Sequence, residues 1–390
     1  METSSSGRTR TGVYNPSCVL CTSWASICPR RAGNRSAAAP GARMGLDTLH
    51  AHRISKWRWG IFGLLSLMGF VGLVAMCMGT VHISVSEVMQ ILWRGILQVV
   101  GVESIETIRT HEIIVLELRG PRVLMAMLVG MALAVAGATF QSMLRNPLAD
   151  PYLLGISSGA ACGAVIALML GWSFLPLAAS VGALLSATVV VIIAHRSGSM
   201  HPHTLVLAGV VVNAFLASVI AVLIAFSSAD ATRGIIFWLM GNVSTQSITV
   251  LSMIAMCVLG SIALLFWKAR NLDLLAQGES VAKQLGLEVE GYKWFLLVVT
   301  SLLTGVVVAY NGLIGFVGLI VPHIGRFLFG SDNRFLIPIA ALLGAIVMVV
   351  ADTLARTIIA PSELPVGAIT ALAGGPFFLL LLRRARHSFT

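Results

Sequence analysis

Charged residues are scarce in this chain of 390 residues, since Asp, Glu, Lys and Arg make up only 11% of it. An ordinary soluble domain carries charge on about a quarter of its residues. Hydrophobic residues make up 57% and gather in runs close to the ~20 residues that cross a bilayer as a helix. A water-soluble globular fold is therefore excluded, and the sequence predicts an all-α polytopic membrane protein.

The sequence also lacks the common catalytic and nucleotide-binding motifs. It contains no GxxxxGK[ST] phosphate loop, no HExxH zinc helix and no GxSxG nucleophile elbow. No apolar run carries the clustered Asp, Glu or Lys side chains that a proton-driven pump needs. An intramembrane enzyme is disfavoured, and any energy for uphill transport must enter from another subunit.

Cysteine is rare and does not form a metal-binding pattern. Cys18 and Cys21 have C-x-x-C spacing, but no second pair accompanies them, so we interpret the spacing as chance. Cys77, Cys162 and Cys257 are isolated in apolar runs and are expected to pack as small apolar side chains. We expect neither a disulfide framework nor a bound metal.

The formal net charge of +10 is concentrated at the start of the chain, where the residues up to Arg58 include nine Lys or Arg and two Asp or Glu. Residues 1–57 are rich in Ser, Arg, Ala and Gly and show no periodic apolar face, so we predict a disordered basic extension. Translation from Met44 is an alternative explanation of this segment. The rest of the chain is nearly neutral, which argues against a nucleic-acid partner.

Ten apolar runs predict ten membrane-spanning helices within a membrane domain over residues 58–387. The expected helices are 59–79, 121–142, 154–171, 174–194, 204–226, 248–267, 292–310, 313–329, 335–355 and 366–382. With the N-terminus inside, the inner loops carry more Lys and Arg than the outer loops. The even number of spans agrees with this bias, so both termini are predicted to be cytoplasmic.

Small and polar residues within these spans predict close helix packing. Gly159 and Gly163 lie four residues apart in the third span, a spacing that lets helices approach closely in lipid. Gln141, Asn213 and His323 are polar residues at membrane depth. We interpret them as hydrogen-bonding across helix interfaces, although such residues also mark transport pathways.

The longest inner loop between the predicted spans, residues 271–290, is amphipathic. Leu274, Leu275 and Leu285 are interleaved with polar residues, and Gly278 and Gly286 interrupt the pattern. Two short helices at the membrane surface are therefore predicted. Their apolar face rests either on lipid or on another protein.

Arginines gather at the predicted outer ends of the second and ninth spans. Arg119 and Arg122 flank the start of the second span, and Asp352 and Arg356 are spaced i, i+4 in the ninth. The arginines either reach lipid headgroups or form a cationic ring for an acidic partner. Asp352 and Arg356 can also pair with each other.

Four runs of sequence carry a resemblance to a known family. They are residues 119–122 (RGPR), 144–151 (LRNPLADP), 315–323 (GFVGLIVPH) and 363–367 (ELPVG). In this order and spacing they resemble the FecCD family, the membrane permeases of ATP-binding-cassette (ABC) importers for iron-siderophores, haem and vitamin B12. The resemblance covers about residues 59–385.

The resemblance implies a type II ABC importer permease fold of ten helices, present as a homodimer with a pathway along the dimer axis. It also implies two cytoplasmic ATP-binding subunits and a solute-binding protein outside the membrane. The ATPase subunits dock on the inner-loop helices, which favours a protein rather than lipid as their partner. The matching coupling positions are Gln277, Gly278, Glu279, Ala282, Leu285 and Gly286.

The resemblance assigns further positions to docking, to the pathway and to an inner gate. Arg119, Arg122 and Arg356 match the arginines that receive the binding protein. The pathway positions are Leu207, Gly209, Asn213, Gly367, Thr370 and Phe377. The inner gate corresponds to His201, Pro202, His203 and Thr204, where the family often has small hydroxylated residues.

Together, the residues and the resemblance predict the permease subunit of an ATP-driven importer in a bacterial or archaeal cytoplasmic membrane. Its cargo is an iron(III)-siderophore or a related metal chelate, such as haem or cobalamin, delivered by the binding protein. This subunit is expected to hold no cofactor, since ATP and Mg²⁺ bind the partner ATPase. The alternative from another class is a secondary transporter driven by an ion gradient.

Overall fold

The computed structural model of the chain describes residues 40–99, 110–172, 174–196 and 199–386. The chain divides into two units, Met1–Ile54 and Ser55–Thr390, and the second contains the helical bundle. The predictions for residues 1–39, including Cys18 and Cys21, lie outside the described residues. Helix α1 (Pro40–Cys77) extends into the segment predicted to be disordered. Pro is favoured at a first helical position, and the Ala, Arg, Met and Leu residues that follow favour a helix.

Each of the ten predicted spans corresponds to a helix. They are α1, α4 (Gly120–Met143), α5 (Ile156–Met169), α6 (Leu175–Ala194), α7 (Pro202–Ala225), α9 (Ile248–Trp267), α12 (Val289–Asn311), α13 (Val317–Phe329), α14 (Asn333–Thr357) and α15 (Val366–Arg386). Seven helical segments among the described residues are long and apolar enough to cross a membrane, and α5, α13 and α15 supply shorter apolar helices. The prediction of about ten membrane helices is confirmed.

The sequence analysis did not resolve most of the shorter elements between these spans. They are α2 (Val85–Val99), α3 (Thr110–Ile113), the π-helical η1 (Ile114–Arg119), the 3-10 turn η2 (Pro151–Leu154), α8 (Ala229–Leu239), α10 (Ala269–Ala276), α11 (Glu279–Gln284), β1 (His195–Arg196) and β2 (Ser199–Met200). Of these, only α10 and α11 were predicted, as a pair of short helices. The two strands form a small antiparallel ladder in which His195 pairs with Met200.

The turn before α5 begins with a side-chain cap. Asp150 accepts a hydrogen bond from the backbone N–H of Tyr152 at 2.9 Å and so caps η2. Burial raises the pKa of Asp150 to about 6, although the Tyr152 N–H bond opposes this shift. Gly155 then takes a left-handed φ of 76°, which lets the chain turn from η2 into α5.

The centre of the bundle is the contact between α4 and α14. Gly130 of α4 and Gly344 of α14 face each other so closely that a Cβ atom on either would collide with the other's carbonyl group. The predicted glycine face of α5 acts in the same way, because Gly159 and Gly163 lie against the α6 backbone at Gly182 and Ala178. Such contacts bring helix backbones together in lipid, where dispersion forces hold them.

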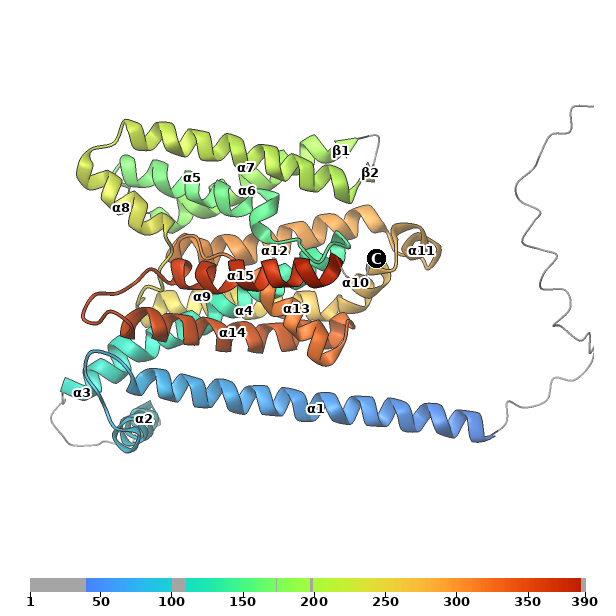
Figure 1. The fold of residues 1–390 in the computed structure, drawn as a ribbon, viewed down its shortest axis with the longest axis horizontal. Coiled ribbons are helices and arrows are strands. Elements are labelled where there is room, and N and C mark those ends of the chain that lie inside the picture. Colours follow the sequence, from blue (N-terminus) through green and yellow to red (C-terminus); the bar gives the residue numbers. More distant parts are fainter. Residues whose placement is uncertain (1–39, 100–109, 173, 197–198, 387–390) are drawn as a thin grey trace, which may run out of the picture. The chain divides into compact units, whose positions relative to one another are not determined.

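The short elements gather at the two ends of the bundle (Figure 1). The helices α10 and α11 and the β1–β2 ladder lie at one end, where α15 also finishes. The helices α2, α3 and α8 and the loop between α14 and α15 lie at the opposite end. The bundle therefore presents two separate sets of loops and short helices, one at each end.

Candidate functional site

The helices α10 and α11 confirm the prediction of two short helices in the inner loop. The turn between them requires Gly278, whose φ of 127° is unfavourable for any other residue. Among the predicted coupling residues, Gln277, Leu285 and Gly286 are exposed, whereas Gly278 and Ala282 are buried. Leu285 is 61% exposed and leaves an apolar side chain accessible at this end of the bundle.

The sixth predicted coupling residue, Glu279, joins a buried network that we call the lysine cluster. It consists of Lys293, Glu279, Glu290 and the backbone of Met200. Lys293 Nζ lies 2.8 Å from Glu279 Oε1 and 3.3 Å from Glu290 Oε1, and it donates to the Met200 carbonyl at 2.6 Å. Glu290 Oε2 accepts the Met200 N–H at 3.1 Å. The cluster therefore connects α11, α12 and β2.

The sequence analysis did not identify Lys293 or Glu290. Their sequence positions give a weak indication of an ion pair. The two residues are spaced i, i+3 at the start of an apolar run, where charged residues are uncommon. Their connection to Met200, about 90 residues earlier in the chain, depends on the tertiary fold.

A second polar network holds α10. Asp273 Oδ1 accepts both the backbone N–H and the side-chain amide of Asn333, each at 2.8 Å. Ser142 then donates to Asn333 Oδ1 at 2.8 Å. Burial raises the pKa of Asp273, and the two hydrogen bonds from Asn333 oppose that shift. The network ties α10 to α14 and to the end of α4.

The four predicted gate residues lie where β2 leads into α7. Pro202 is the first residue of α7, a position at which its missing N–H has no helical partner to lose. His201 and His203 are exposed, and Pro202 and Thr204 are half-buried. The predicted gate segment is thus one residue away from Met200 of the lysine cluster.

At the opposite end, the structure brings the three predicted docking arginines together. We call Arg119, Arg122, Arg356, Asp352 and Glu363 the arginine cluster. Arg122 forms two parallel hydrogen bonds to the Glu363 carboxylate, at 3.0 and 2.9 Å, and a third at 3.1 Å to Asp352. Arg356 Nε lies 3.0 Å from Asp352 Oδ2, which confirms the predicted pairing of those residues. The cluster contains one more cation than it does carboxylates.

Arg119 has a different set of partners. It donates to the carbonyl oxygens of Met76 at 2.7 Å, Cys77 at 3.3 Å and Val81 at 2.5 Å. A guanidinium in this position satisfies carbonyl groups that the last turn of α1 leaves without helical partners. Arg119 and Arg356 are only 6% and 7% exposed, so the arginine cluster is not the open cationic ring that the sequence suggested.

The arginine cluster surrounds a cavity of about 370 Å³. Its lining includes Arg119, Arg122, Arg356, Glu363 and Thr245, together with the backbone near Gly79. Glu363 is the most exposed member of the cluster, with 43% of its side chain accessible. The structure therefore places the most exposed carboxylate of the cluster against the Arg122 guanidinium.

Comparison with known proteins identifies the family. The FecCD transport family model matches residues 67–384. YvrB of Bacillus subtilis (strain 168), named an uncharacterized ABC transporter permease protein, is 44% identical over 78% of this chain and 88% of its own length. The hemin transport system permease protein HmuU of Yersinia pestis is 42% identical, over 70% of this chain and 84% of its own length. This chain belongs to the FecCD transport family.

A solved structure agrees with this assignment. An ABC transporter described as being of the metal-chelate type, in an inward-facing conformation, superposes with a TM-score of 0.73 at 28% identity. The match covers 83% of this chain and 98% of that one. The protein is therefore the permease subunit of an ABC importer, a multi-pass inner-membrane protein that works with ATP-binding and solute-binding subunits. ATP hydrolysis occurs in the partner subunit.

The permease divides the predicted pathway residues of α7 between two faces. Leu207 is 65% exposed, and Val211 and Phe215 continue the same exposed face. Gly209, by contrast, is buried against the backbone at Leu153, and Asn213 donates to the Tyr152 carbonyl at 2.6 Å. This placement gives Gly209 and Asn213 a helix-packing role, because their side of α7 lies against η2.

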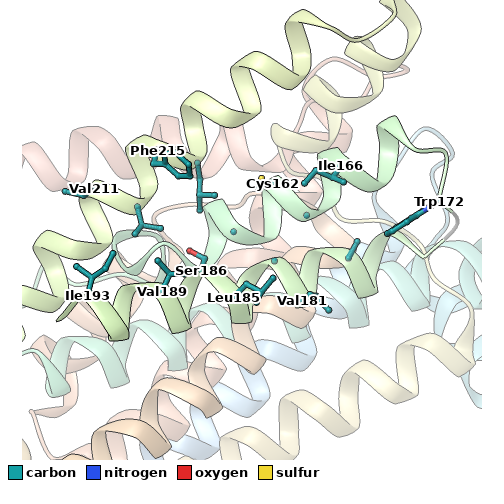
Figure 2. Close-up of a pocket in the computed structure, with 16 residues that line it drawn as sticks. Cys162, Ile166, Trp172, Val181, Leu185, Ser186, Val189, Ile193, Val211 and Phe215 are labelled. Atoms are coloured by element: carbon teal, nitrogen blue, oxygen red, sulfur yellow. The ribbon is translucent and has the colours of Figure 1, made fainter. Parts of the chain in front are cut away.

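Between α5, α6 and α7 the permease surface forms an apolar groove of about 630 Å³ (Figure 2). Figure 2 shows Val211 and Phe215 of α7 on one side of this groove, and Val181, Leu185 and Val189 of α6 on the other. The exposed face of α7 therefore continues into a groove that has almost no polar lining. Such a surface suits lipid or another apolar protein surface.

The predicted pathway residues of α15 are buried or half-buried. Gly367 is buried and donates its N–H to the Gly241 carbonyl at 3.1 Å, and Thr370 is 6% exposed and donates to Gly367 at 3.0 Å. Phe377 is half-buried, and its ring lies edge-on to His323. Both glycines of the predicted pathway, Gly209 and Gly367, are thus positions of close helix packing.

Polar side chains within the membrane helices mostly donate hydrogen bonds to backbone carbonyl groups of neighbouring elements. Gln141 of α4 donates to the carbonyl oxygens of Gly318 and Leu319 at 3.2 and 3.3 Å, and it accepts a hydrogen bond from Arg326. Gln141 and Asn213 thus hydrogen-bond across helix interfaces as expected, whereas His323 contacts the Phe377 ring instead. The guanidinium of Arg326, in α13, reaches toward α4 and also donates to the Ala138 carbonyl.

Proposed function

We propose that two copies of this permease form a pathway for a metal chelate, which a solute-binding protein delivers and two ATP-binding subunits drive across the membrane. The observation that carries the proposal is the pair of unlike surfaces at opposite ends of one apolar bundle. One end holds the arginine cluster and its cavity, and the other holds α10 and α11 with the exposed Leu285. The relatives support the chelate class, since HmuU is named for hemin and the solved transporter for metal chelates.

The homodimer is supported by the way in which α7 and α15 pack. Helix α7 packs on α5 and α6, whereas α15 packs on α13 and α14. Helix α7 leaves most of its apolar surface uncovered, including Leu207 and Phe215. A passage lined by α7 and α15 is best completed by a second copy. We revise the proposed lining on α7 to the face of Leu207, Val211 and Phe215.

The proposed orientation puts α10, α11 and both termini in the cytoplasm, and the arginine cluster on the outside. Single cysteines at Gly286 and Glu363 test it, in a background without native cysteines. A membrane-impermeant maleimide should label the Glu363→Cys variant in intact cells and the Gly286→Cys variant only in inverted vesicles. The reverse pattern would overturn the orientation.

The transport function is tested in proteoliposomes that contain the permease, its ATPase and its binding protein. We expect uptake of an iron(III)-siderophore, hemin or cobalamin that requires ATP and the binding protein. The permease purified alone should bind neither ATP nor Mg²⁺, because we place both on the ATPase. Uptake by the permease alone under an ion gradient would instead favour a secondary transporter.

A further inference from the structure

Lys293 stands out because it is a completely buried cation near the end of a membrane bundle. Its relative exposure is 0%, at the start of α12. Leaving a buried charge without partners is strongly unfavourable. The family assignment does not explain why a lysine is buried at this position.

The partners of Lys293 come from three elements. Three oxygen atoms surround its ammonium group: Glu279 Oε1, Glu290 Oε1 and the Met200 carbonyl. A planar guanidinium would not match such a compact site. Lysine therefore fits the cluster because its ammonium group contacts three different elements at once.

Two of these oxygens belong to consecutive helices, and the third belongs to a strand much earlier in the chain. Glu279 is the first residue of α11, Glu290 lies in the first turn of α12, and Met200 ends β2. Glu290 also accepts the Met200 N–H, so β2 is held through both its donor and its acceptor. A displacement of α11 must therefore either carry Met200 with it or break a buried ion pair.

Met200 leads directly into the start of α7. Only His201 separates it from Pro202, whose ring fixes its own φ and restricts the residue before it. This short connection leaves little slack between the lysine cluster and the first turn of α7. The exposed face that begins at Leu207 follows one turn later.

Helix α10 is held differently. Asp273 joins it to Asn333 and Ser142, and so to α14 and α4, which form the centre of the bundle. Of the two helices proposed to receive the ATPase, α10 is thus anchored to the bundle centre and α11 to the gate segment.

We propose that Lys293 is a positioning residue that links α11 to β2, so that the movement of α11 caused by the ATPase is transmitted to the gate segment His201–Thr204. This inference rests on the proposed function, since it needs α11 to receive the ATPase and the start of α7 to act as the gate. It adds a specific mechanical link between those two sites, made by one ammonium group.

The experiment uses the complete transporter in proteoliposomes and compares Lys293→Met with wild type. The methionine has a similar length but no charge, so α11 loses its connection to β2. We expect ATP hydrolysis to continue and the amount of substrate moved per ATP to fall about tenfold, within the range typical of coupling between sites. Lys268→Met is the matched control, because its ammonium lies over the Trp267 ring at the same end.

A distance measurement separates this role from a merely structural one. Spin labels at Ser331 and His203 report on the gate segment, and labels at Ser331 and the exposed Lys283 report on α11. In wild type, both distances should change when ATP binds. In Lys293→Met, only the α11 distance should change. If the gate distance still changes as in wild type, the proposal is overturned.

Two further results keep the test decisive. If Lys293→Met does not assemble, Glu279→Ala replaces it, since that variant removes the carboxylate that α11 supplies and leaves the contacts of Lys293 to Glu290 and Met200. A normal transport-to-ATP ratio in the assembled Glu279→Ala variant would overturn the link. If wild type itself shows no ATP-driven uptake, the proposed function fails, which is distinguishable from a variant that transports normally.

Discussion

The arginine cluster and the lysine cluster lie at opposite ends of one bundle and differ in the sign of their net charge and in the space beside them. In the arginine cluster, Asp352 and Glu363 pair with Arg122 and Arg356, Arg119 adds a further cation, and a cavity of about 370 Å³ lies beside them. In the lysine cluster, one buried ammonium group lies between two carboxylates and a backbone carbonyl. An excess of positive charge beside a cavity can attract a further carboxylate, whereas a buried cation enclosed by its own partners can only join the elements that supply them.

Removing Asp352, the more buried carboxylate of the arginine cluster, should have the largest effect, which is a loss of stability. Asp352 has only 1% of its side chain exposed and contacts both Arg122 and Arg356. In Asp352→Ala, two cations would remain at a site that excludes water, so we expect the free energy of unfolding to fall by about 3 kcal/mol. Thermal unfolding of the purified permease measures this effect.

Glu363→Ala is the matched control for that prediction. It removes a carboxylate from the same cluster that is 43% exposed, and exposed ion pairs contribute about 1 kcal/mol or less. Equal losses of stability in Asp352→Ala and Glu363→Ala would contradict the difference in burial between the two carboxylates.

Reversing one charge in the arginine cluster should have the next largest effect, on partner binding. Arg122→Glu places a carboxylate beside Asp352 and Glu363, so affinity for the solute-binding protein should fall about tenfold or more. Binding to the permease in nanodiscs at several salt concentrations measures both the affinity and its salt dependence. Arg233→Glu, at an exposed arginine of α8, is the control. Equal losses in both variants would indicate a long-range charge effect instead of a docking site.

A smaller change in affinity for the solute-binding protein should follow from removing the charge of Glu363, which competes with a partner's carboxylate for Arg122. In Glu363→Gln, Arg122 loses a bidentate carboxylate partner and becomes available to a partner's carboxylate. Affinity for the solute-binding protein should rise about threefold, consistent with the modest energy of an exposed ion pair. Glu290→Gln in the lysine cluster should leave that affinity unchanged. A lower affinity in Glu363→Gln would mean that Glu363 itself contacts the partner.

The smallest expected effect is on the pH dependence of stability, through Asp273 of α10 at the other end of the bundle. Burial raises the pKa of Asp273 above its usual value, so the neutral form is favoured more in the folded state than in the unfolded chain. Asp273 therefore contributes stability below its unfolded pKa, and this contribution is lost as pH rises through the folded pKa. Asp273→Asn should flatten the pH dependence of thermal unfolding in this acidic range. An unchanged profile would contradict the burial of the charge.

The helices and family were predictable from the sequence because local patterns encode them. The apolar runs gave all ten membrane helices, and the four motifs led to the family that the comparisons confirm. Interactions that join distant segments left weaker signals. The pairing of Asp352 with Arg356 was visible at i, i+4, whereas the contact of Lys293 with Met200 spans 93 positions.

The direction in which individual side chains point was also hard to predict. The family resemblance marked Gly209 and Gly367 as pathway positions, but their lack of a side chain serves close contact with neighbouring backbones. Arginines at a predicted membrane boundary suggested an exposed ring, yet Arg119 turns inward to the carbonyl groups at the end of α1. Burial depends on the packing of several helices together, which a single sequence does not show.

The contact between Gly130 and Gly344 has a consequence for movement. Two helices whose backbones touch have no flexible side chains between them to take up sliding, so α4 and α14 must travel as one rigid body. Conformational change during a transport cycle must then occur at other boundaries. Helices α5, α6 and α7 pack together on the far side of α12, and the contact of Gly159 with Gly182 joins α5 to α6 in the same way. The glycine contacts thus divide the permease into units that keep their internal arrangement while the boundaries between them change.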